Sequence, residues 1–95
     1  SFIKLDKPNK MCILGEMGEL GKYSKDEHQK LINRMETSGI ESIFVGEEFL
    51  NLTNKNLYLE TSDLIDDITK YNLQNRNILI KGSRGIRLED LVRYL

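Results

Sequence analysis

Two glycine-containing loops hold most of the residues in this sequence that are suited to binding a ligand. The first, Gly15-Glu-Met-Gly-Glu-Leu-Gly21, has three glycines and two carboxylates after a short apolar run. The second, Lys81-Gly-Ser-Arg-Gly85, has two cations and a hydroxyl after another apolar run. Such a basic loop can receive an anion, either a phosphate or a carboxylate. The alternative is a plain turn whose charges are solvated, as charged surface residues usually are.

Neither loop matches a known phosphate-binding motif. A P-loop needs the pattern G-x-x-x-x-G-K-[ST], and the sequence has no such run. Gly15, Gly18 and Gly21 recur at every third position, which does not fit the G-x-G-x-x-G fingerprint of dinucleotide-binding domains. The residues therefore predict a ligand-binding domain without a nucleotide cradle of its own.

The remaining reactive residues do not complete a catalytic or metal site. His28 is the single histidine, and no cysteine, aspartate or second histidine is spaced to form a metal site or a triad with it. We expect it to be a packing residue. Glu16 and Glu19 are candidates for acid–base work, with solvated carboxylates as the alternative. Cys12 lies in an apolar run and is predicted to be a buried, reduced thiol.

The elements that must position these loops alternate along the chain. Helical patterns begin at Ser24, Thr61 and Leu88. Ser24 and Glu27 have the spacing of a capping box, and Leu88, Leu91, Val92 and Leu95 have that of an amphipathic helix. Between the helices, continuous apolar runs are typical of strands buried on both faces; they are 11–14, 42–45, 57–59 and 78–80. The order predicts an α/β fold, a Rossmann-like open and mainly parallel sheet of about four strands with flanking helices.

Length and charge narrow the possible partners. The 95 residues suffice for a single domain. Fourteen basic and fifteen acidic residues give a net charge of −1, so we expect no binding to nucleic acid or to an anionic membrane. The apolar runs are too short to cross a bilayer. The opening Ser1-Phe-Ile-Lys4 has no initiator Met and no signal peptide pattern, which predicts a part of a longer protein.

Both loops resemble motifs of the Mur ligases. Residues 14–28, "LGEMGELGKYSKDEH", resemble the L-G-[DE]-M-x-E-L-G-x-x-S-x-x-x-H stretch of the branch that adds D-alanyl-D-alanine. Residues 78–92, "ILIKGSRGIRLEDLV", resemble the V-L-[VI]-K-G-S-R-x-[MI]-x-[LM]-E ending of the same branch. The resemblance covers nearly the whole chain, although 47–72 match only in pattern.

The resemblance implies that residues 1–95 are most of a C-terminal Rossmann-like domain. Such ligases also have an N-terminal domain and a central ATPase domain, both absent from this chain. In the family, ATP phosphorylates the carboxylate of UDP-muramoyl tripeptide, and the amine of D-Ala-D-Ala attacks the acyl phosphate. The C-terminal domain closes over the site and brings the amine substrate. ATP and Mg²⁺ would be bound mainly by the central domain, so the chain alone should be inactive and hold no cofactor.

The resemblance also implies a set of site residues. It implies no catalytic residue and no metal ligand in this chain, and a supporting role for His28. Ser83 would bond the dipeptide, and Lys81 or Arg84 would pair with its carboxylate. The full set on the D-Ala-D-Ala side is Lys81, Gly82, Ser83, Arg84, Glu16, Met17, Glu19 and Leu20.

Two further expectations follow from the same resemblance. The first strand of the family's domain would precede Ser1, which leaves a sheet edge through which two copies could pair. The protein would work in the bacterial cytoplasm. The residues alone leave two other classes open: a stand-alone α/β ligand-binding module, and an interaction domain without a ligand. An upstream G-x-x-x-x-G-K-[ST] motif would favour the ligase over both.

Overall fold

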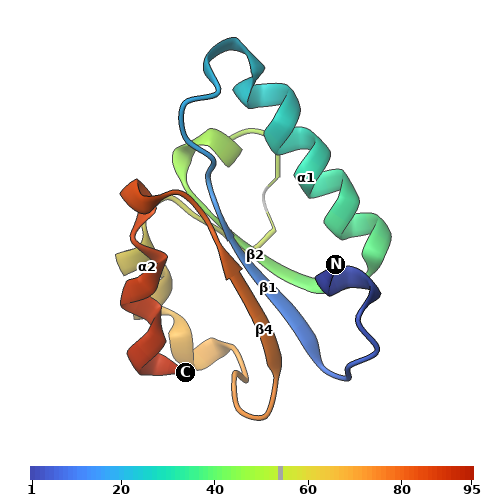
Figure 1. The fold of residues 1–95 in the computed structure, drawn as a ribbon. Coiled ribbons are helices and arrows are strands. Elements are labelled where there is room, and N and C mark those ends of the chain that lie inside the picture. The colour runs from blue at the N-terminus through green and yellow to red at the C-terminus, as the bar shows by residue number, and fades with distance from the viewer. Residues whose placement is uncertain (54) are drawn as a thin grey trace.

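The computed structural model describes residues 1–53 and 55–95, and it contains one parallel sheet. The strands are β1 (Lys10–Gly15), β2 (Glu41–Val45), β3 (Leu57–Tyr58) and β4 (Asn77–Lys81). Their order across the sheet is β3-β2-β1-β4, and every pair is parallel (Figure 1). Each predicted apolar run lies at a strand. The α/β fold with a parallel sheet of four strands is therefore confirmed.

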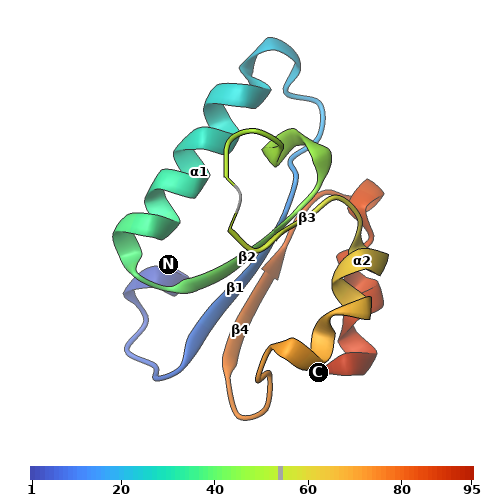
Figure 2. The same cartoon turned by 180° about the vertical axis from the view of Figure 1, so that it is seen from behind.

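β1 lies inside the sheet, because it pairs with both β2 and β4. Leu14 is in register with Phe44 on one side and with Lys81 on the other. All strands point the same way, so the loops that follow them gather at one edge of the sheet (Figure 2). Within the described part of the chain, β3 and β4 are the edge strands. Pairing of two copies through such an edge stays a prediction.

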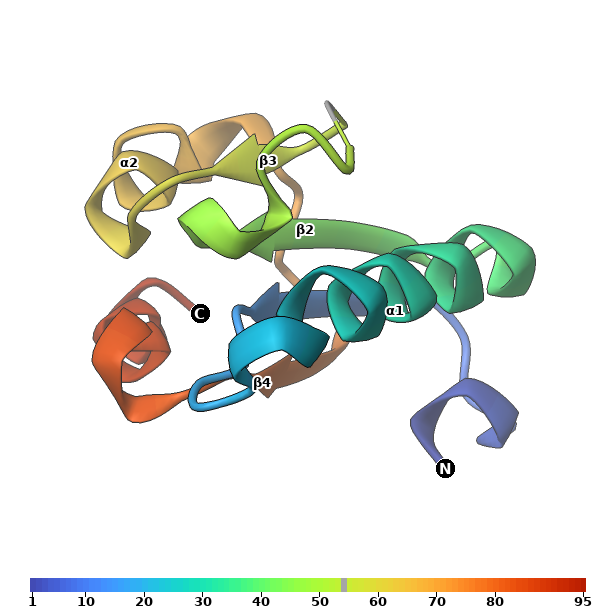
Figure 3. The same cartoon turned by 90° about the horizontal axis from the view of Figure 1, so that it is seen from above.

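Helices cover both faces of the sheet. The helix α1 (Ser24–Ser38) lies on one face, and α2 (Thr61–Asp66) lies on the other with the 3-10 segment Leu88–Tyr94 (Figure 3). Each face has its own apolar core, as expected for a parallel sheet between helices. On the α1 face the buried residues are Cys12, Leu14, Ile32, Met35, Phe44 and Phe49. On the α2 face they are Met11, Ile13, Ile43, Val45, Leu64, Leu73, Leu88 and Leu91.

The C-terminal segment differs from the predicted amphipathic α-helix. Residues 88–94 form a 3-10 helix, in which residues three apart lie on one face. Leu88 and Leu91 are accordingly buried, whereas Val92 is 63% exposed and Leu95 44% exposed. The predicted burial is confirmed for Leu88 and Leu91 and is wrong for Val92 and Leu95.

The predicted capping box at the start of α1 is wrong. Tyr23 is the N-cap, and no side chain caps the helix. A 3-10 turn at Gly21–Tyr23 leads into α1, and the amide of Ser24 already bonds the carbonyl of Gly21. The hydroxyl of Ser24 instead donates to Glu48 over 2.9 Å, and Glu27 pairs with Lys30.

A cluster of polar side chains attaches β3 to the segment after α2. The hydroxyl of Tyr58 donates to Asp67 Oδ2 over 2.9 Å and lies 2.7 Å from the hydroxyl of Tyr71. Lys70 Nζ lies 3.2 Å from the same carboxylate oxygen. Burial and these neighbours raise the pKa of Tyr58. The hydrogen bond from Tyr58, followed by that from Lys70, lowers the pKa of Asp67.

We predict that Asp67→Asn destabilises the fold at neutral pH but not in acid. The folded-state pKa of Asp67 lies below its ordinary value of 3.8, so its stabilisation is present above that value. It is lost as pH falls through the folded-state pKa. Urea unfolding at neutral pH and at several pH values below 3.8 measures the difference in free energy. Asp66→Asn, an exposed neighbour, is the control, and a pH-independent difference for Asp67→Asn would contradict the assignment.

Candidate functional site

The ends of β1 and β4 approach each other so closely that two glycines are required. A Cβ atom at Gly82 would lie 2.9 Å from the Cα of Gly15, and such a distance forces the backbone to shift. A Cβ atom at Gly15 would lie 2.7 Å from Ile86 Cγ2 and 3.0 Å from Leu88 Cδ1. The glycines therefore fix how near the two loops come, and Ile86 and Leu88 close the space on the α2 side.

Backbone hydrogen bonds then join the two loops to each other and to β2. The amide of Ser83 donates to the carbonyl of Glu16 over 3.1 Å. The amide of Glu16 donates to the carbonyl of Val45 over 2.8 Å. The sequence predicted that the loops would face each other if their strands were neighbours, and the pairing of β1 with β4 confirms that condition.

A cavity of about 320 Å³ lies between the loops and α1. Its lining is mainly apolar, with Lys81 and Ser83 as the residues whose side chains carry polar groups. Lys81 is exposed and Ser83 half-buried. Such a cavity suits a small ligand that has an apolar body and an anionic group. The lining residues are Leu14, Gly15, Met17, Gly18, Leu31, Lys81, Gly82 and Ser83.

The structure brings together some of the predicted site residues and separates others. Met17, Lys81, Gly82 and Ser83 line the cavity. The other predicted residues lie outside the lining, and their assignment to a site stays a prediction. They are Glu16, Glu19, Leu20 and Arg84.

Glu16 is turned toward β2 and the segment that follows it. Its Oε1 accepts from the amide of Glu48 over 3.2 Å. Its side chain fills the space beside Gly46, where φ is 132° and an added Cβ would lie 2.7 Å from the Cβ of Glu16. The loop after β1 therefore presents Met17 and Gly18 to the cavity rather than this carboxylate.

Glu19 adopts a backbone conformation that is unfavourable for its type. Its φ is 60°, in the left-handed region. A non-glycine residue there costs roughly 1–2 kcal/mol. Residues held in such conformations cluster at ligand sites, where the surrounding structure enforces them. The same region is also adopted by Arg87 and by four asparagines in other turns, so the conformation of Glu19 marks a tight turn in this loop.

His28 lies fully buried beneath the loop after β1. Its Nε2 accepts from the amide of Met17 over 2.9 Å, and its Nδ1 lies 2.7 Å from the carbonyl of Ser24. The imidazole meets the ring of Phe49 edge-on, with 4.7 Å between the centroids. The predicted packing position is confirmed. Its partner Phe49 and the role of Glu48 were not predicted, because no local pattern in the sequence marks them.

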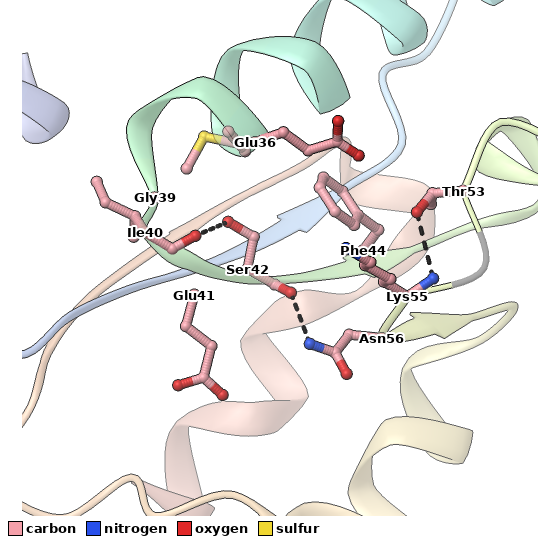
Figure 4. Close-up of a pocket in the computed structure, with 10 residues that line it drawn as sticks. Glu36, Gly39, Ile40, Glu41, Ser42, Phe44, Thr53, Lys55 and Asn56 are labelled. Atoms are coloured by element: carbon pink, nitrogen blue, oxygen red, sulfur yellow. Dashed lines mark hydrogen bonds between the residues drawn. The ribbon is translucent and has the colours of Figure 1, made fainter.

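A second cavity lies at the opposite end of β2 and carries no comparable arrangement. Its volume is about 440 Å³, and it lies between the end of α1 and the segment before β3 (Figure 4). Two of its polar side chains bond backbone carbonyls: Ser42 Oγ donates to Ile40 O, and Asn56 Nδ2 donates to Ser42 O. Charged side chains of both signs also line it, namely Glu36, Glu41 and Lys55.

The described part of the chain contains neither a cluster of metal-ligating side chains nor a helix that could span a membrane. Residues 1–53 and 55–95 contain no cluster of three or more His, Cys, Asp or Glu side chains placed to hold a metal ion. No helix in the same part of the chain is both long and apolar enough to cross a membrane.

Comparison with known proteins bears out the resemblance of the two motifs. No family model matches the sequence. Curated relatives named UDP-N-acetylmuramoyl-tripeptide–D-alanyl-D-alanine ligase match over most of the chain. The protein of Rickettsia prowazekii is 32% identical over 94 residues, which cover 90% of this chain and 21% of that protein. The protein of Borreliella burgdorferi is 37% identical over 92 residues, which cover 87% and 20%.

The chain is Mur ligase-like. The ligase of Bacillus subtilis is also similar, with 32% identity over 97 residues. The chain spans about a fifth of the length of these relatives. The parallel sheet of this Mur ligase-like chain, with helices on both faces, is consistent with a Mur ligase C-terminal domain.

We predict that Gly82→Ala destabilises the fold by about 1–3 kcal/mol, as overpacking of a tight contact does. The added methyl group would meet the backbone of Gly15, which cannot rotate away. Gly85→Ala in the same loop is the matched control, since a Cβ there meets nothing within 4 Å. It should be neutral or stabilising by up to about 1 kcal/mol. Urea unfolding measures both, and equal effects would contradict the close approach.

Proposed function

We propose that the chain is the C-terminal domain of an ATP-dependent ligase that adds D-alanyl-D-alanine to UDP-N-acetylmuramoyl tripeptide. The enzyme would serve peptidoglycan precursor synthesis in the bacterial cytoplasm. The names of the relatives support this activity, and the observation that carries it here is the cavity between the two loops. It combines an apolar lining with a cation and a hydroxyl, which suits a small dipeptide that ends in a carboxylate.

The cavity offers a distinct partner for each part of the acceptor dipeptide. Leu14, Met17 and Leu31 would contact its methyl groups. The ammonium of Lys81 would pair with its carboxylate, and Ser83 would bond its amide. Arg84 is exposed beside the cavity, and its planar fork would reach the same carboxylate once the site closes. Held in this way, the dipeptide keeps its amine free to attack an acyl phosphate.

The contribution of the chain to such a reaction is positional. In this proposal ATP and Mg²⁺ are bound mainly by the central domain of the enzyme, as the resemblance to the Mur ligases implies. Placing the amine next to the acyl phosphate replaces a bimolecular encounter by a step within one complex. Closure would also exclude water, which hydrolyses an acyl phosphate.

We predict that Lys81→Ala and Arg84→Ala raise the KM for D-alanyl-D-alanine by about 10–100-fold, the usual effect of losing a hydrogen bond to a charged group. Ser83→Ala should raise it by about 2–10-fold, since its bond is neutral. The measurement is phosphate release by the full-length protein with ATP, Mg²⁺ and UDP-muramoyl tripeptide, with and without the dipeptide.

Arg93→Ala provides a control for the loss of a cation, because Arg93 is exposed on the C-terminal 3-10 segment away from the loop. It should leave the KM unchanged. Phosphate release that ignores the dipeptide would refute the proposed activity and favour a stand-alone binding module. Release that depends on the dipeptide but is unaffected in all three loop variants would refute the site assignment alone.

A further inference from the structure

His28 is the centre of a hydrogen-bonded ring that connects the loop after β1 to two other elements. Met17 N–H donates to its Nε2, and its Nδ1 lies 2.7 Å from Ser24 O in the first turn of α1. The hydroxyl of Ser24 donates to Glu48 Oε1 over 2.9 Å. The amide of Glu48 in turn donates to Glu16 Oε1, so the ring returns to the loop.

The partners of His28 decide which ring nitrogen carries the hydrogen. The amide of Met17 can only donate, so the Nε2 atom that faces it must offer its lone pair. The hydrogen therefore sits on Nδ1, where the carbonyl of Ser24 accepts it. His28 is 0% exposed, and both ring nitrogens have protein partners. The imidazole thus has one orientation and one tautomer.

The bond to His28 supplements the two backbone bonds that hold this loop to neighbouring strands. Glu16 bonds the carbonyl of Val45 and accepts from Ser83, and both bonds lie at the base of the loop. Met17 and Gly18 come next, and both line the cavity. Within the described residues, the backbone of Met17 is held by a side chain through the hydrogen bond that its amide donates to His28 Nε2.

We propose that His28 is a positioning residue of the acceptor site. It holds the backbone of Met17 so that Met17 and Gly18 form the wall of the cavity opposite Lys81 and Ser83. This inference rests on the proposed function for its effect on the dipeptide. The structural part of the inference, that His28 positions the backbone of Met17, rests on the hydrogen-bond geometry alone.

Two substitutions separate this role from simple packing against Phe49. In His28→Gln the amide oxygen reaches the position of Nε2 and still accepts from Met17. In His28→Asn the shorter amide reaches the position of Nδ1 and keeps only the contact with Ser24. The two variants keep opposite bonds: Gln retains an acceptor for Met17, and Asn retains the contact with Ser24. Asn is also one methylene group smaller, so a packing role would speed amide exchange in the core at Ile13 as well as at Met17.

In the full-length protein, His28→Asn should raise the KM for D-alanyl-D-alanine about tenfold, equivalent to the loss of one hydrogen bond of about 1.4 kcal/mol. The KM for ATP should not change. His28→Gln should stay within about threefold of the wild type in both constants, because the acceptor for Met17 is retained. Equal KM values for the dipeptide in the two variants would overturn the proposal.

Amide hydrogen exchange in the same proteins tests whether His28 positions Met17, and it does so without measuring activity. His28→Asn should speed exchange at Met17, while exchange at Ile13 in β1 stays slow and His28→Gln resembles the wild type. Faster exchange at both positions would make His28 a core residue and overturn the proposal, as would unchanged exchange at Met17. If the wild type shows no dipeptide-dependent phosphate release, the proposed function fails, while this comparison still decides whether His28 holds Met17.

Discussion

The contact between Gly15 and Gly82 at the ends of β1 and β4 is the constraint on which the candidate site depends. A side chain at Gly82 would force the two strand ends apart, because the nearest atom is the Cα of Gly15, and one at Gly15 would meet the side chains of Ile86 and Leu88. The Ser83–Glu16 backbone bond joins the two loops next to this contact. On one side of the contact Ile86 and Leu88 exclude solvent, and on the other the cavity opens toward Leu31 of α1. The contact between Gly15 and Gly82 therefore separates a packed side, at Ile86 and Leu88, from a side that faces the cavity.

The local charge at the cavity differs from the charge of the whole chain. The net charge is −1, but the carboxylates of Glu16 and Glu48 are directed at the amide of Glu48 and the hydroxyl of Ser24. Neither these two side chains nor that of Glu19 lines the cavity, whereas Lys81 does. The charged side chain that an anion in the cavity would meet is therefore that of Lys81.

The sequence predicted those features that depend on local patterns. Continuous apolar runs located all four strands, and the alternation with helices predicted a parallel sheet. The hydrogen-bonded ring around His28 was not predicted because its bonds join residues that are distant in the sequence. Ser24 and Glu48 are 24 residues apart, and Glu16 and Glu48 are 32 residues apart. The predicted capping box is absent for a related reason: the hydroxyl of Ser24 donates to Glu48, a partner that is distant in the sequence. The spacing of Leu88, Leu91, Val92 and Leu95 predicted an α-helix, whereas the structure has a 3-10 helix in which Leu88 and Leu91, three residues apart, are buried.

The exposure of Lys81 and Arg84 also constrains how the chain can act on a ligand. An ion pair that is open to water contributes about 0–1 kcal/mol, whereas even millimolar affinity requires about 4 kcal/mol. The cations of the loop therefore cannot hold a small carboxylate tightly while water surrounds them. The same pair becomes several times stronger when a second body covers the site and lowers the local dielectric. A site built of backbone contacts, an apolar lining and exposed cations thus gains affinity mainly through closure, which is what a domain that brings a substrate to a separate nucleotide site requires.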